Sequence, residues 1–88
     1  MIHPSSLVSK SAIIHESSHI GPFCIIEDNV EIGKNNKLIS NVSVVGNTTI
    51  KDNNCFFPFS SIGSEPQDLK FKNEKSFLKI GNNNKFRE

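Results

Sequence analysis

Apolar residues recur at every sixth position of the chain. The members of this first column are Ile2, Val8, Ile14, Ile20, Ile26, Ile32, Leu38, Val44, Ile50, Phe56 and Ile62, and the same phase returns at Ile80 and Phe86. An amphipathic α-helix has a period of about 3.6 residues and a half-buried strand has a period of two, so a period of six fits neither alone. It fits a short strand, a corner and another short strand.

Two further columns support this interpretation. Four residues after each member of the first column stands a small or medium-sized residue, in a second column of Ser6, Ala12, Ser18, Cys24, Val30, Asn36, Val42, Thr48, Asn54 and Ser60. Three residues after the first column stands a run of Asn, at Asn29, Asn35, Asn41, Asn47, Asn53 and Asn83. Asn tolerates the left-handed backbone region better than most residues, so a regular Asn predicts a regular corner, several with positive φ.

The prolines indicate that three sides close one coil. Pro4, Pro22 and Pro58 are separated by 18 and 36 residues, which places them at the same corner of an 18-residue triangular coil. The predicted fold class is therefore all-β, a parallel β-helix whose coils stack at about 4.8 Å. We expect the first column to be buried, at Ile2, Ile14, Ile20, Ile26, Ile32, Val44, Ile50 and Ile62.

The repeat breaks at residues 64–79. The inward phase falls there on Asp68 and Glu74, and two carboxylates facing a narrow apolar core would be costly. This segment is therefore expected to leave the coil as an excursion loop, and Lys70 stands within it. A solvated insertion and a ligand-contacting loop both remain open, because loops on a rigid scaffold often carry function.

Composition excludes several classes of protein. The chain has 88 residues, enough for one domain, and a net charge of +1, which gives no reason to expect nucleic acid or an anionic membrane as a partner. It contains neither an apolar run of about 20 residues nor a signal-peptide pattern. Cys24 and Cys55 form no CxxC pair, and they differ in phase and in coil, so two free thiols are expected.

The histidines do not indicate a metal site. His3 and His15 follow inward positions and His19 precedes one, so we predict that the three lie on different sides of the coil and do not converge. The glycines are spaced for turns rather than for binding phosphate. No metal and no cofactor is predicted.

Several motifs resemble those of one enzyme family, the UDP-N-acetylglucosamine O-acyltransferases. They are the IHP start, IGPFC at 20–24, VEIG at 30–33, FxxIG at 59–63, QDLK at 67–70 and IGxxNxxRE at 80–88. QDLK at this distance from FxxIG is the most specific of them. The handedness of the coil does not follow from the spacing, but the resemblance implies a left-handed helix.

The resemblance implies a function for the parent protein. The family begins lipid A synthesis by transferring an (R)-3-hydroxyacyl chain from acyl carrier protein to the 3-hydroxyl of UDP-N-acetylglucosamine. Gln67, Asp68 and Lys70 match family residues that hold the substrate between the subunits of a cytoplasmic homotrimer. A lysine can meet a phosphate as a point charge, and a carboxylate can accept hydrogen bonds from sugar hydroxyls.

The general base of the family and its C-terminal helical domain are not found in these 88 residues. The base is a histidine in a later coil, and none of His3, His15 and His19 matches it. The resemblance thus implies that residues 1–88 are the N-terminal part of the β-helical domain, inactive and prone to aggregate alone. Two alternatives remain open: another hexapeptide acyltransferase, such as the later N-acyltransferase of the pathway, and a non-catalytic assembly module.

Overall fold

Short strands joined by tight corners make up the structure, which is a computed structural model that describes residues 1–63 and 77–87. The strands in this part are β1 (Leu7–Val8), β2 (Ile13–Ile14), β3 (His19–Ile20), β4 (Ile25–Ile26), β5 (Val30–Ile32), β6 (Lys37–Leu38), β7 (Ser43–Val44), β8 (Asn47–Ile50), β9 (Cys55–Phe56), β10 (Ser61–Ile62), β11 (Phe77–Ile80) and β12 (Lys85–Phe86). No helix among the described residues is long and apolar enough to cross a membrane.

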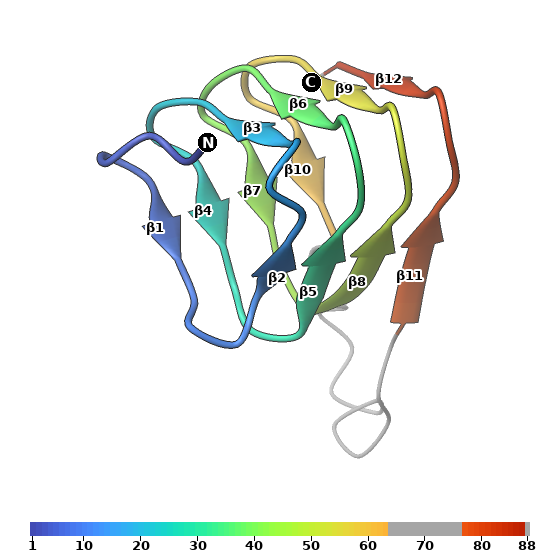
Figure 1. The fold of residues 1–88 in the computed structure, drawn as a ribbon, viewed down its shortest axis with the longest axis horizontal. Coiled ribbons are helices and arrows are strands. Elements are labelled where there is room, and N and C mark those ends of the chain that lie inside the picture. The colour runs from blue at the N-terminus through green and yellow to red at the C-terminus, as the bar shows by residue number, and fades with distance from the viewer. Residues whose placement is uncertain (64–76, 88) are drawn as a thin grey trace.

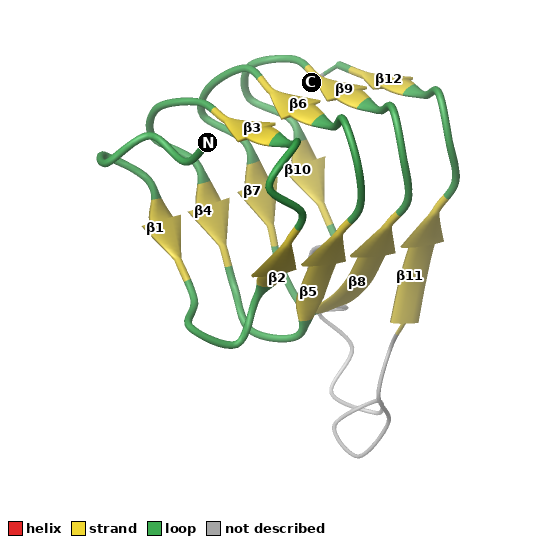
Figure 2. Cartoon of the chain, viewed as in Figure 1, coloured by secondary structure: helices red, strands yellow, loops and turns green. Residues whose placement is uncertain are grey.

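Parallel pairing joins each strand to the strand three places along the chain. Sheet A contains β3, β6, β9 and β12, sheet B contains β1, β4, β7 and β10, and sheet C contains β2, β5, β8 and β11. The three sheets form the three sides of a coil (Figures 1 and 2). Leu7 pairs with Ile25 and Ile13 with Glu31, so the pairing offset is the predicted 18 residues. The fold is a left-handed parallel β-helix, which confirms the predicted fold class.

The first column forms the core. From Ile20 to Ile80 its described members are at most 8 % exposed, and Phe86 is half-buried. The rings of Phe56 and Phe86 stack with their centroids 4.8 Å apart. Burial of each such side chain stabilises the fold by about 1.5–3 kcal/mol. The prediction is wrong for Ile2, which is 45 % exposed, and too strong for Ile14, which is only half-buried. Both lie in the first coil, which has another coil on one side only.

The Asn column forms corners, as predicted. Five of its members have a positive φ of 52–63°, namely Asn29, Asn35, Asn41, Asn53 and Asn83. Asn47 differs, because it begins β8 and the preceding Gly46 takes the left-handed conformation instead, with a φ of 76°. Phe23 and Phe59 also have positive φ, of 58° and 69°, and the sequence analysis did not predict this.

Polar members of the second column are buried because they join the coils. The Asn36 side chain donates to the Lys51 carbonyl oxygen at 2.6 Å and accepts the Asn54 N–H at 2.9 Å. Ser18 makes the equivalent pair, donating to Gly33 O at 2.6 Å and accepting the Asn36 N–H at 3.0 Å. No buried side-chain polar atom in the described part of the chain lacks a partner. The sequence analysis noted only that this column is small or medium-sized, and the structure shows that its polar members also bond successive coils together.

The excursion is shorter than predicted. Residues 77–79 belong to β11, where Phe77 pairs with Asn47 and Ile80 with Ile50, so the coil resumes before residue 79. This offset is 30 residues rather than 18, and 30 − 18 = 12 residues are therefore inserted. The strand starts earlier because the backbone of residues 77–79 pairs in register with residues 47–49 of β8, with Leu78 opposite Thr48.

The two cysteines are free, which confirms the prediction that they do not bond. Cys24 is buried in the second column, and Cys55 is half-buried on sheet A.

Candidate functional site

Both ends of the excursion lie at the corner where sheet B passes into sheet C. Gly63, just after β10, has a φ of 74°, and Phe77 at the other end pairs with Asn47. A Cβ on Gly46 would lie 3.3 Å from the Gly63 carbonyl oxygen, so the turns of successive coils are closely stacked here. The chain therefore leaves and rejoins the coil at this one corner.

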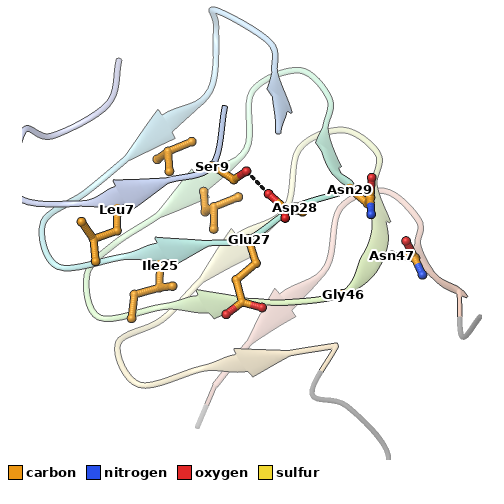
Figure 3. Close-up of a pocket in the computed structure, with 10 residues that line it drawn as sticks. Leu7, Ser9, Ile25, Glu27, Asp28, Asn29, Gly46 and Asn47 are labelled. Carbon is orange, nitrogen blue, oxygen red and sulfur yellow. Dashed lines mark hydrogen bonds between the residues drawn. The ribbon is translucent and has the colours of Figure 1, made fainter. Parts of the chain in front are cut away.

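An open pocket of about 700 Å³ extends along sheet B to the same corner (Figure 3). Its lining residues are Leu7, Val8, Ser9, Ile25, Ile26, Glu27, Asp28, Asn29, Gly46 and Asn47. Leu7 and Ile25 are exposed and form an apolar side, while the polar groups gather at the corner. The pocket thus combines an apolar surface with carboxylate and amide groups.

Asp28 is oriented by the coil that precedes it. The hydroxyl of Ser9 donates a hydrogen bond to Asp28 Oδ1, and the hydroxyl of Ser11 donates to the same oxygen at 3.2 Å. Ser11 Oγ also accepts the N–H of Asn29 at 3.3 Å. Glu27 stands beside them, exposed at the end of β4. Carboxylates and amides of this kind suit a ligand rich in hydroxyl groups.

The pocket lining includes no histidine. Nδ1 of His3 accepts the Ser5 N–H at 3.0 Å, and His15 makes the same bond with Ser17. Both imidazoles therefore close turns. Neither is placed as a general base for a ligand on sheet B.

The prediction that the histidines lie on different sides is wrong for two of them. Ile2 bridges Ile20, so His3 and His19 flank this pair on the same side of the coil. The error arose because His3 follows its inward neighbour whereas His19 precedes its own. His15 follows β2 on sheet C. In residues 1–63 and 77–87, no three metal-ligating side chains come together.

Gln67, Asp68 and Lys70, the predicted substrate-binding residues, lie outside the described residues. Their role stays a prediction, although the corner from which their segment departs is the corner that holds the pocket. Sequence reasoning missed Glu27 and Asp28. A signal was present, because Glu27 and Gly63 are 36 residues apart and the 18-residue period puts both at one corner.

Comparison with known proteins assigns this architecture. No protein-family model matches the chain. The acyl-[acyl-carrier-protein]–UDP-N-acetylglucosamine O-acyltransferase of Psychrobacter sp. strain PRwf-1 is 52% identical over 87 residues, which is 99% of this chain and 34% of the relative. The chain is a homologue of the UDP-N-acetylglucosamine O-acyltransferases. The match corresponds to their N-terminal part.

Solved structures of UDP-N-acetylglucosamine O-acyltransferases agree. The enzyme from Moraxella catarrhalis RH4 superimposes with a TM-score of 0.93 at 45% identity, over 99% of this chain and 34% of that one. The Acinetobacter baumannii structure gives the same TM-score at 48% identity, with the same coverage of each chain. The chain spans about a third of the length of the curated relatives it matches. The resemblance predicted from IGPFC, VEIG and QDLK is confirmed.

Proposed function

We propose that the protein carrying this β-helix is an O-acyltransferase of lipid A synthesis. It transfers an (R)-3-hydroxyacyl chain from acyl carrier protein to the 3-hydroxyl of UDP-N-acetylglucosamine. The observation that carries the proposal is the 52% identity to the Psychrobacter enzyme, which runs through 99% of the chain and so includes the excursion. Residues 1–88 are then the N-terminal part of the acyltransferase domain, in a cytoplasmic homotrimer that needs no cofactor.

The division of labour follows from the chemistry. A sugar hydroxyl is a poor nucleophile at neutral pH, so a general base must take its proton as the acyl carbon is attacked. No histidine that could act as this base lines the pocket. The resemblance implies that the family's base lies in a later coil. The contribution of this segment is therefore to bind and position the nucleotide sugar. The 88-residue chain alone should transfer no acyl group.

Lys70 and Asp68 are proposed to make the decisive contacts. In this arrangement Lys70 meets a phosphate, Asp68 accepts hydrogen bonds from sugar hydroxyls, and Gln67 lies beside them. Glu27 and Asn29 at the foot of the same corner supply further acceptors and donors. The excursion and the pocket together then form one side of the binding cleft.

A hybrid enzyme tests the proposal. In it, this chain replaces the matching third of the Psychrobacter enzyme, an exchange that the TM-scores of 0.93 to related structures support. The hybrid is expected to acylate UDP-N-acetylglucosamine. A hybrid that folds and assembles but transfers no acyl chain would contradict the proposal, and would favour the non-catalytic module.

Lys70→Ala and Asp68→Ala in the hybrid should each lower kcat/KM about ten- to hundredfold. The loss of one hydrogen bond to a charged group is worth roughly 1.5–3 kcal/mol. Steady-state kinetics with varied UDP-N-acetylglucosamine checks this, and the thermal midpoint should stay nearly unchanged. Lys72→Ala, in the same segment but outside QDLK, is the matched control and should retain activity. Equal losses in all three variants would mean that the segment acts only through its general charge or fold.

A further inference from the structure

Side chains build all three corners of the first coil. At each corner a side-chain atom accepts the backbone N–H of a serine two residues later. The pairs are His3 Nδ1 with Ser5 at 3.0 Å, Ser9 Oγ with Ser11 at 3.2 Å, and His15 Nδ1 with Ser17 at 3.0 Å. The corners of the second coil are different, because Phe23, Asn29 and Asn35 take the left-handed conformation there. We call the corners at His3 and His15 the histidine corners.

The serines of these corners also join the first coil to the second. Each hydroxyl oxygen accepts the backbone N–H of the residue 18 positions later. The pairs are Ser5 with Phe23 at 3.1 Å, Ser11 with Asn29 at 3.3 Å, and Ser17 with Asn35 at 3.0 Å. Val8 and Ile14 of the first coil are only half-buried, so apolar burial holds this coil less firmly than the later ones. A corner that opens therefore also loosens the contact between the coils.

Both histidine corners require a neutral imidazole. A backbone N–H can only donate, so Nδ1 of each ring must accept and the ring proton must lie on Nε2. Protonation adds an N–H at Nδ1 and removes this acceptor. The new N–H could turn to the serine Oγ, which lies 2.8 Å from Nδ1 at each corner, but the serine backbone N–H would then lose its partner. Histidine ordinarily changes its charge between about pH 5 and pH 8.

The histidine corners lie at the two ends of one segment, residues 4–14, which carries β1 and β2. Figure 1 shows these two strands at one end of the stack. Leu7, Val8 and Ser9 of this segment line the pocket on sheet B. On sheet A the end of the stack is closed separately, because Ile2 bridges Ile20. Protonation of both imidazoles would thus release both ends of the same segment.

We propose that the first coil is a pH-responsive end of the β-helix. It is closed while His3 and His15 are neutral, and it opens when they are protonated, while the second and later coils stay closed. The direction follows from the acceptor role of Nδ1, since the two hydrogen bonds are present at high pH and are lost as the pH falls. Opening exposes the edges of β4 and β5 and removes part of the pocket wall, so the first coil would regulate access to sheet B.

Charged and titratable groups adjoin the two histidines within the first coil and on the coil packed against it. They are the Met1 α-ammonium and His19 beside His3, and Glu16, Glu31 and Lys34 beside His15. The first set carries no carboxylate and the second carries two, whereas the acceptor role of Nδ1 is the same at both corners. A response shared by the two corners would therefore come from the loss of the acceptor rather than from a nearby charge.

Hydrogen exchange of the hybrid enzyme at single-residue resolution tests the proposal. Protection factors divide out the intrinsic pH dependence of exchange. From about pH 8 to about pH 5.5 they should fall about two- to tenfold at the backbone N–H groups that depend on a histidine corner, because each group loses one ordinary hydrogen bond. These groups are those of Ser5, Ser17, Phe23 and Asn35.

The Ser9 corner is the internal control, because a hydroxyl acceptor does not titrate in this range. The N–H groups of Ser11 and Asn29 should keep their protection. Asp28 accepts hydrogen bonds from both serines of this corner, and carboxylates ordinarily titrate below the range of the experiment. Equal protection of the histidine corners at the two pH values would overturn the proposal. An equal loss at all three corners would also overturn it, since the imidazoles would then not be the cause.

Variants of the histidines complete the test. In His3→Asn with His15→Asn, the amide oxygen takes the place of Nδ1 and accepts the same N–H without titrating, so both corners should stay protected at both pH values. His3→Ala with His15→Ala should lack this protection at both. His19→Asn is the matched control, because His19 lies on β3 outside the two corners, and it should leave the response unchanged. A pH dependence that persists in the Asn double variant would contradict the proposal. Acyl transfer plays no part in this measurement, so a folded but inactive hybrid that shows the response would overturn the proposed function alone.

Discussion

Gly21→Ala is expected to prevent the first coils from folding. An alanine Cβ at this position would overlap the Ile39 carbonyl oxygen and would lie 2.8 Å from the Leu38 carbonyl oxygen. Both obstacles are backbone atoms of the next coil. The Gly21 N–H donates to the same Leu38 oxygen at 2.8 Å, so the coils cannot separate without losing that bond. The cost should exceed about 4 kcal/mol, a large share of the stability of a small domain.

Hydrogen–deuterium exchange of the hybrid enzyme provides the measurement. Peptides covering residues 19–50 should lose protection in the Gly21→Ala variant, or the protein should become insoluble. Ile39→Ala is the matched control, because residue 39 stands in the same column one coil later and already carries a side chain. Its cost should be about 1 kcal/mol or less, since Ile39 is only half-buried. Normal protection of Gly21→Ala would mean that the coils have slack that the structure does not show.

Asn36→Ala should destabilise the same region by roughly 3–5 kcal/mol. Asn36 is 1 % exposed, and its side chain bonds to the Lys51 carbonyl and to both the backbone and the side-chain N–H groups of Asn54. Alanine would leave buried groups without partners, at about 1–3 kcal/mol each. Asn36→Ser should recover part of the loss, because Ser18 makes the equivalent two bonds one coil earlier.

Thermal unfolding and hydrogen exchange of the hybrid check the Asn36 series. Asn35→Gly is the control, since Asn35 is exposed and glycine accepts its φ of 55°. Its free energy of unfolding should change by no more than about 0.5 kcal/mol. If Asn36→Ala and Asn35→Gly had equal effects, the buried ladder of side chains would be incidental to stability.

The sequence predicted the coil because a period of six and a run of Asn leave few alternatives. It did not predict that Asn36 and Asn54 join the coils, since a pattern of residue size carries no information about which carbonyl faces which amide. The sequence also wrongly predicted that Ile2 is buried, because periodicity does not show which coil lies at the end of the stack. Asn47 does not form the predicted corner, because Gly46, one residue earlier, takes the left-handed conformation more easily.

The candidate site was less accessible to sequence reasoning. Asp68 and Lys70 were predicted from a break in the repeat and a family motif, and both signals are local. Glu27 and Asp28 have no such signal by themselves. Their place in the candidate site becomes apparent only when the 18-residue coil stacks them in line with Gly63, where the excursion begins. The conformation of Phe23 and Phe59 was missed for a related reason: their 36-residue spacing puts them at one corner, but it carries no information about the positive φ that they share with the Asn residues.

The 18-residue pairing offset, which holds from β1 to β10, also determines the order in which the polypeptide can acquire structure. Each strand finds its partner among residues that leave the ribosome shortly before or after it, so a coil can close on its predecessor while synthesis continues. The hydroxyl oxygens of Ser6 and Ser18 in the first coil would already be in place to accept hydrogen bonds from the backbone N–H groups of Cys24 and Asn36 as these residues emerge. The pairings of β11 with β8 and of β12 with β9 must wait for twelve extra residues, and the first of them is the strand pairing beside the proposed binding cleft. Elongation itself would then complete the scaffold first and the proposed substrate-binding corner afterwards.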